Sequence, residues 1–181
     1  MAIAIGASPQ RLERFRALQT DKSLLLIQDV KTRWNSTYDM LLRAWTLRQT
    51  IAEWIRGEND QRFETLHIKK QEWQQVLLLI RLLGPFKRWT EAVSKTRGAT
   101  IHKAWFVYNL ITAHIMRLQN SIVRKQFAWK NELRQALDKG LAKLLAYRGK
   151  STSPEALIYS VASVIDPATR LGQFQVSNDF K

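Results

Sequence analysis

Apolar residues recur at helical spacing along most of this chain, and one short run breaks the pattern. Three leucines and an isoleucine follow one another at residues 24–27, within a segment from Ser23 to Gln28 that predicts a strand buried on both faces. A lone strand cannot complete a sheet, because its backbone N–H and C=O groups would find no partners. The sequence therefore predicts an all-α fold with at most one orphan strand near residues 23–28.

Four long helical patterns and two or three short ones account for the rest of the chain. The long patterns run from about residue 36 to 57, from 68 to 93, from 100 to 118, and from just before 129 to 145. Pro85 should kink or break the second of them, because proline removes a hydrogen bond and clashes with the preceding turn. Gly140 lies inside the fourth and predicts a close helix contact. The pattern as a whole is typical of a helical bundle.

A single helical domain over residues 1–181 is the expected organisation. A chain of 181 residues usually forms one domain, and its 45% apolar content suits a packed core. Residues 1–30 would supply an N-terminal helix and the strand remnant. Residues 36–174 would form the bundle, and residues 175–181 a loose tail.

Charge is the strongest compositional signal. The chain has 29 Lys and Arg against 15 Asp and Glu, a formal net charge of +14. Such a charge attracts polyanions, of which nucleic acid is the first candidate, an anionic membrane surface the second and an acidic protein the third. A basic, solvated surface without a partner is the alternative.

Features that the sequence lacks exclude several kinds of chemical site and bear on where the protein is located. There is no Cys, which excludes disulfides, a thiol nucleophile and a Cys-based zinc site, and fits a reducing compartment. Residues 1–7 are apolar, but they are too few for a secretion signal and lack a basic start. Lys and Arg interrupt the other apolar runs, so no membrane-spanning helix is expected. An intracellular protein without a membrane partner is therefore predicted.

The turn after the strand candidate carries a recognisable motif. Residues 29–37, D-V-K-T-R-W-N-S-T, resemble the T-R-W-N-S-T signature of the hAT superfamily of DNA transposases. Residues 8–15 are similar to the segment that precedes this signature in fungal members. Residues 83–94 resemble the L-x-P-F…T…S helix of the family. Residues 162–174 resemble its D-P element, although Ala168 and Thr169 depart from the usual Arg-Tyr.

The resemblance implies a fragment of a transposase without its catalytic centre. In the family, an RNase H-like sheet holds a D-D-E metal site and is interrupted by a large helical insertion. Residues 23–28 would lie on that sheet and residues 36–174 in the insertion. The catalytic carboxylates, the zinc-binding BED domain and the dimerisation region would lie outside this chain. No catalytic, cofactor or metal residue is therefore expected, and the protein is predicted not to be an enzyme.

The remaining titratable residues do not supply a substitute metal site. Two-metal phosphoryl chemistry requires several carboxylates that converge on the ions. Asp29, Asp39 and Asp166 are read as structural residues at the turn, in a first helical turn and at a helix end. The three histidines share no ligand spacing and are read as surface or core residues: His67, His102 and His114.

The resemblance assigns nucleic-acid binding to Lys31, Arg33 and Trp34. In the family, the Trp of the R-W motif stacks against a flipped base near the transposon end. The chemistry suits this role, because a Trp face stacks on any base while flanking cations hold phosphates. In the alternative interpretation, Trp34 packs on its own helix and Arg33 pairs with Asp29 or Asp39.

Two functions are compatible with these features. The first is a non-catalytic, transposase-derived helical module that binds nucleic acid through a basic surface, in the nucleus if the resemblance holds. The second is a protein-interaction module, or an effector-like domesticated fragment of fungal type, that acts on a host or cellular protein. A homodimer could then form by pairing of strand 23–28. A decayed remnant without a selected role is a further alternative.

Overall fold

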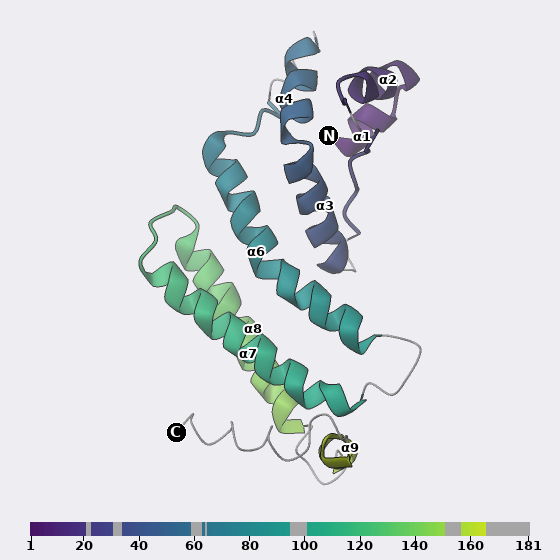
Figure 1. Cartoon of the computed structure of the whole chain (residues 1–181). Helices are drawn as coiled ribbons and strands as arrows, with labels where there is room; N and C mark the ends of the chain where they lie inside the picture. Colours follow the sequence, from purple (N-terminus) through teal and green to yellow (C-terminus); the bar gives the residue numbers. More distant parts are fainter. Residues whose placement is uncertain are drawn as a thin grey trace. The chain divides into compact units, whose positions relative to one another are not determined.

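The computed structural model describes residues 1–20, 23–30, 34–58, 63, 65–94, 101–150 and 157–165. Within these ranges the chain forms eight α-helices, one short 3-10 helix and no β-strand, which confirms the predicted all-α fold (Figure 1). The elements are α1 (Ala2–Gly6), α2 (Pro9–Ala17), α3 (Trp34–Thr46), α4 (Arg48–Gly57), α6 (Lys70–Val93), η1 (Ile101–Lys103), α7 (Ala104–Val123), α8 (Lys130–Lys150) and α9 (Leu157–Ile165).

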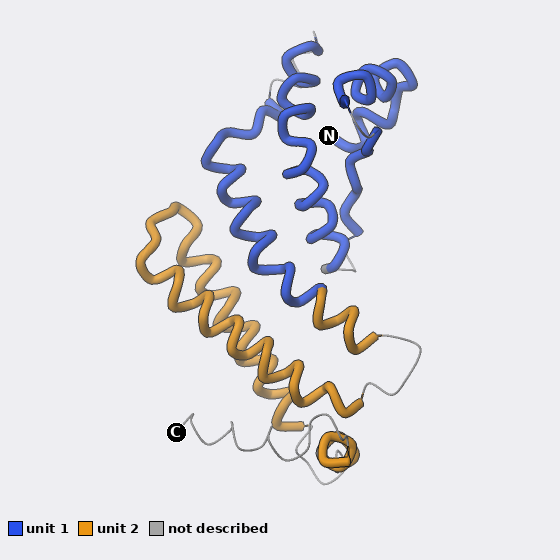
Figure 2. Tube along the Cα trace, viewed as in Figure 1, with its two compact units in different colours: residues 1–87 blue, residues 88–181 orange. Residues whose placement is uncertain are grey.

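The chain divides into two compact units, residues 1–87 and 88–181 (Figure 2). The boundary falls within α6, which contributes its residues up to Lys87 to the first unit and the remainder to the second. The single domain expected from the sequence stays a prediction. Among the described residues, no helix is long and apolar enough to cross a membrane.

An aromatic cluster forms the core of the first unit. Trp54 is 1% exposed and lies between Phe15 and Phe63, with ring centroids 6.5 Å and 5.1 Å away, both in edge-to-face contact. Four aliphatic side chains complete the buried cluster: Ile5, Leu47, Ile51 and Ile55. Edge-to-face geometry places the positive ring edge against the negative ring face, so these pairs add attraction to the burial of apolar area. The cluster joins α1, α2 and α4.

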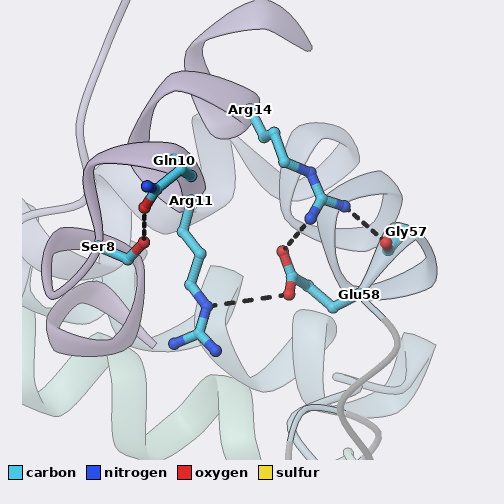
Figure 3. Close-up of polar contacts among 6 residues, drawn as sticks. All are labelled: Ser8, Gln10, Arg11, Arg14, Gly57 and Glu58. Atoms are coloured by element: carbon cyan, nitrogen blue, oxygen red, sulfur yellow. Dashed lines mark hydrogen bonds and ion pairs between the residues drawn. The ribbon is translucent and has the colours of Figure 1, made fainter.

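A charged clamp fastens α2 to the end of α4 beside this core (Figure 3). Glu58, whose side chain is 7% exposed, pairs with Arg14 at 3.1 Å and with Arg11 at 3.9 Å. Arg14 also donates a 2.6 Å hydrogen bond to the carbonyl oxygen of Gly57, the last residue of α4. The end of a helix leaves carbonyls without intrahelical partners, so this guanidinium satisfies a backbone acceptor and a carboxylate at once.

The strand predicted over residues 23–28 is wrong. The segment has no regular secondary structure and runs alongside α3 (Figure 1). Side chains satisfy its backbone: Gln19 bonds both the N–H and the carbonyl of Leu24, at 2.8 Å and 2.9 Å, and Arg43 donates to the carbonyl of Leu25 at 2.8 Å. The apolar run reflects burial, because Leu24 and Leu26 pack on the core. The strand-paired homodimer loses its structural premise, and a dimer as such stays untested.

One helix boundary differs from expectation. The first long helix is split at Leu47 into α3 and α4, because Leu47 has φ −94° and ψ 15° and turns its side chain into the core. Of the two effects expected at Pro85, a kink or a break, the break does not occur, because Pro85 lies inside α6. Proline therefore costs this helix a hydrogen bond without terminating it.

In the second unit, α7 and α8 form an antiparallel hairpin (Figure 1). Ile115 and Ile122 of α7 and Leu133 and Leu137 of α8 are its buried residues, and a 2.6 Å hydrogen bond joins the Gln119 amide of α7 to Asp138 of α8. The short helix α9 is attached to η1 by a fully buried hydroxyl. Ser163 Oγ donates to the carbonyl oxygens of His102 and Tyr159, at 3.1 Å and 2.9 Å. The apolar side chains of α9 are exposed: Leu157, Ile158, Val161, Val164 and Ile165.

Gly140 corrects a further expectation and provides a test of α8. A Cβ added at Gly140 would meet no atom within 4 Å, so the glycine does not mark a close helix contact. We predict that Gly140→Ala raises the free energy of unfolding by about 1 kcal/mol, because alanine restricts the unfolded chain more and exposes less helix backbone. Chemical denaturation monitored by circular dichroism measures the change.

Gly84 is the matched contrast within α6. A Cβ there would lie 3.3 Å from Tyr38 Cε2. The gain in helix propensity from Gly84→Ala should therefore be reduced or reversed by crowding against the ring. Equal stabilisation by the two substitutions would contradict this difference in packing.

Candidate nucleic-acid interface

The structure describes the residues that flank the predicted contact turn, but it does not describe the side chains predicted to make the contacts. Lys31 and Arg33 lie outside the described residues. Trp34 is the first residue of α3, but the orientation of its side chain is outside the description as well. The flanking residues 29–30 and 35–40 are described, and they show how the turn is held.

Both ends of the turn are tied together by what we call the Asp29 clasp, formed by Asp29, Val30, Ser36 and Thr37. The hydroxyls of Ser36 and Thr37 each donate to Asp29 Oδ1 at 3.0 Å, and the backbone N–H of Val30 donates to Ser36 Oγ at 2.6 Å. A carboxylate at a helix N-terminus also interacts favourably with the helix dipole. The clasp therefore fixes both ends of residues 30–36 against the first turn of α3.

The same helical turn is anchored to α6. Asp39 of α3 forms an ion pair with Lys87 of α6, and Lys87 Nζ lies 5.4 Å from the ring centroid of Tyr38. Gly84 of α6 also lies close to this ring, since an added Cβ would come within 3.3 Å of Tyr38 Cε2. The absence of a side chain at Gly84 lets α6 approach Tyr38 closely. The Asp29 clasp is therefore formed with α3, whose first turns are held in place by these contacts with α6.

These bonds bear on the alternative interpretation of Arg33. Asp29 and Asp39 were its two candidate partners. Asp29 accepts two hydroxyl hydrogen bonds, and Asp39 pairs with Lys87. Neither carboxylate depends on Arg33 for a partner.

The residues considered as metal ligands lie in unrelated surroundings. In the described ranges, no group of three or more His, Asp or Glu residues is placed to hold a metal ion. His114 makes an edge contact with Trp89 at 5.6 Å, and His67 is exposed. His102 belongs to η1, where its carbonyl accepts from Ser163. Asp166 lies outside the described residues.

Charge is unevenly divided between the units, a feature that the sequence reasoning missed. Residues 1–87 contain 14 Lys and Arg and nine Asp and Glu, whereas residues 88–181 contain 15 and six. No Asp or Glu occurs between Glu91 and Glu132, a stretch with seven Lys and Arg. The signal was present in the sequence as an interval without acidic residues. The net charge of +14 for the whole chain does not reveal this interval.

Comparisons with known proteins agree with this architecture. Residues 2–82, a little under half of the chain, match the family model described as the ZBED1 RNase-like helical domain. The chain is 32% identical over 180 residues to a protein of Talaromyces stipitatus named as a transcriptional regulator, tpeD, covering 98% of this chain and 18% of that protein. It is 31% identical over 104 residues to a protein of Zea mays named as an AC transposase, covering 55% of this chain and 13% of that protein.

The matches support a hAT-like, transposase-derived helical domain. The chain spans less than a fifth of the length of the curated relatives it matches. No solved structure matches it. Residues 29–37, which form the contact turn and its clasp, fall inside the matched range 2–82.

The clasp can be tested by removing its two hydroxyls separately. Ser36→Ala removes the acceptor of the Val30 N–H and one donor to Asp29, whereas Thr37→Ala removes only one donor. We predict faster amide exchange at Val30 in Ser36→Ala than in Thr37→Ala, with a loss of stability of about 0.5–2 kcal/mol, the usual range for a helix N-terminal cap. Hydrogen exchange followed by NMR measures both. Unchanged protection of Val30 in Ser36→Ala would rule out the clasp.

Proposed function

We propose that this chain is a non-catalytic, transposase-derived helical module that binds nucleic acid through the turn at residues 29–37, with Lys31, Arg33 and Trp34 as contact residues. The Asp29 clasp carries the proposal. A turn whose ends are already fixed loses less conformational freedom on binding, so more of its contact energy becomes affinity. The acidic residue within the motif is used to close the turn by hydroxyl hydrogen bonds.

The three contact residues divide the work by chemistry. Lys31 and Arg33 bind phosphate oxygens, and Arg33 can do so with two parallel hydrogen bonds because its guanidinium is a planar fork. Trp34 stacks on an unpaired base. Two relatives support this class of ligand by name, since one is named as a transcriptional regulator and the other as a transposase. A nuclear location is part of the same proposal.

The absence of catalysis is part of the proposal and has its own test. Asp29 and Asp39 are engaged in local bonds to side chains of the same unit, which supports structural roles for both. We expect no cleavage of labelled DNA when the purified chain is incubated with Mg²⁺ or Mn²⁺. Metal-dependent cleavage that disappears in Asp29→Asn would overturn this assignment.

The contact role of Trp34 predicts a graded loss of affinity. Trp34→Ala should weaken binding to DNA with an unpaired base by roughly 5- to 150-fold, the equivalent of the 1–3 kcal/mol typical of base stacking. Trp34→Phe should lose less, because it keeps an aromatic face. Phe106→Ala is the matched control, since Phe106 is an aromatic residue of the second unit that is 47% exposed. Fluorescence anisotropy with a labelled oligonucleotide measures the dissociation constants.

Salt dependence distinguishes specific phosphate contact from other modes of binding. Removing Lys31 or Arg33 should each reduce the slope of log K against log salt concentration by roughly 0.7–0.9, the contribution of one neutralised phosphate. Circular dichroism should show the same helix content in each variant. The proposal fails if the intact chain does not bind at low salt, or if its binding does not change with salt.

A further inference from the structure

Three exposed lysines form a row along α8, which we call the lysine row: Lys139, Lys143 and Lys150. Their spacings of four and seven residues place them on one side of the helix, within about 40° of each other. The row extends over about 16 Å, given a rise of about 1.5 Å per residue. Leu133 and Leu137, which are buried in the second unit, lie about 100° and 140° around α8 from the middle of the row.

No acidic residue is placed to neutralise the lysine row from within α8. Ion pairs on a helix form between residues three or four apart, and none of these positions around the three lysines holds Asp or Glu. Asp138 is adjacent in sequence, but its Oδ1 accepts a 2.6 Å hydrogen bond from the Gln119 amide of α7. Glu132 lies two turns before Lys139 and marks the end of the row.

The row also contains a repulsive pair. Lys139 and Lys143 are four residues apart, and like charges at this spacing destabilise a helix. A polyanion laid along the helix would remove this repulsion. Ala146 lies between Lys143 and Lys150 on the same side of the helix, and its side chain is exposed and small. A rigid, linear polyanion can therefore come close to the helix backbone between the lysine side chains.

The chemistry of the row favours a duplex phosphate backbone over other anions. Sites for single strands combine cations with aromatic platforms for the bases. Tyr147 lies beside the row, with Lys150 Nζ 5.7 Å from its ring centroid, but a single ring does not form the succession of platforms on which the bases of a single strand stack. A membrane-surface helix needs an apolar face to insert into lipid, whereas α8 buries Leu133 and Leu137 within the protein. A duplex presents regularly spaced charge along a stiff axis, which matches a straight row.

We propose that the lysine row of α8 is a second binding surface for nucleic acid, which contacts the phosphate backbone of a duplex without reading its sequence. The inference takes its class of ligand from the proposed function. It adds a site in the unit 88–181, which is independent of the contact turn in the unit 1–87. Binding by the turn and binding by the row can therefore fail separately.

The test compares two triple variants of the full chain that each remove three positive charges. Lys139→Gln, Lys143→Gln and Lys150→Gln together remove the row. The matched control combines Arg16→Gln, Arg56→Gln and Lys69→Gln, three exposed cations that each have a Glu three residues away, at Glu13, Glu53 and Glu72. Fluorescence anisotropy with labelled duplex DNA is measured at several salt concentrations. Replacing the three row lysines by Arg preserves charge and controls for changes in helix packing.

The row variant should reduce the salt slope for duplex DNA by about 2.7, since each neutralised phosphate contributes about 0.9. Its dissociation constant at low salt should rise roughly tenfold or more, and by the same factor for duplexes of unrelated sequence. The control variant should reduce the slope by less than one, and the Arg variant should bind like the intact chain. Equal losses in the row and control variants would overturn the proposal, because net charge alone would then account for binding.

The same measurements separate this site from the contact turn. If only the Trp34 and Arg33 variants lose affinity, the row is not a site and the proposed function stands. If only the row variant loses affinity, the row stands and the role of the turn fails. If neither the contact-turn variants nor the row variant loses affinity, both the proposed function and the role of the lysine row are contradicted. Equal or tighter row-dependent binding of polyglutamate would assign the row to acidic proteins, and tighter binding of single strands would exclude the duplex assignment.

Discussion

Carboxylates are scarce in this chain, and the first unit uses them to connect its elements. Glu58 joins α2 to the end of α4, Asp39 joins α3 to α6, and Asp29 closes the turn before α3. Glu72 accepts a 2.6 Å hydrogen bond from the backbone N–H of Lys69 at the start of α6. Each of these carboxylates has different partners: cations for Glu58 and Asp39, hydroxyls for Asp29 and a backbone N–H for Glu72. The aromatic core around Trp54 joins α1, α2 and α4, and the Glu58 ion pairs link α2 and α4 beside it.

The second unit is built on a different basis. Its hairpin is held by Ile115, Ile122, Leu133 and Leu137 and by one amide-to-carboxylate hydrogen bond. Acidic residues are fewer in it, six against 15 Lys and Arg, and only two of them occur between residues 92 and 150. Packing of apolar side chains does not require charged side chains to pair with each other. The first unit uses Arg11, Arg14 and Lys87 in internal ion pairs, and the net charge from its Lys, Arg, Asp and Glu residues is smaller than that of the second unit.

The helices could be predicted from the sequence because each long one keeps an apolar stripe over several turns. The errors occur where a sequence pattern reflects the surroundings of the side chains and does not determine the backbone conformation. The apolar run at residues 24–27 was read as a strand, yet Leu24 and Leu26 are partly buried against the core while Gln19 and Arg43 satisfy the backbone. Gly140 was read as a contact, although nothing lies near it. Both errors depend on tertiary neighbours that periodicity does not contain.

The candidate site was predictable to a similar degree. The motif drew attention to Lys31, Arg33 and Trp34, and their contact role stays a prediction. The hydrogen bonds from Ser36 and Thr37 to Asp29 were not foreseen, because the sequence reasoning considered only Arg33 as a partner of Asp29. The lysine row was missed because its recognition requires knowing which side of α8 is buried. One consequence of the Lys139 and Lys143 pair concerns the solvent. Added salt screens the repulsion within the free helix and weakens attraction to phosphates. A higher ionic strength should therefore stabilise α8 and weaken its binding to phosphates at the same time.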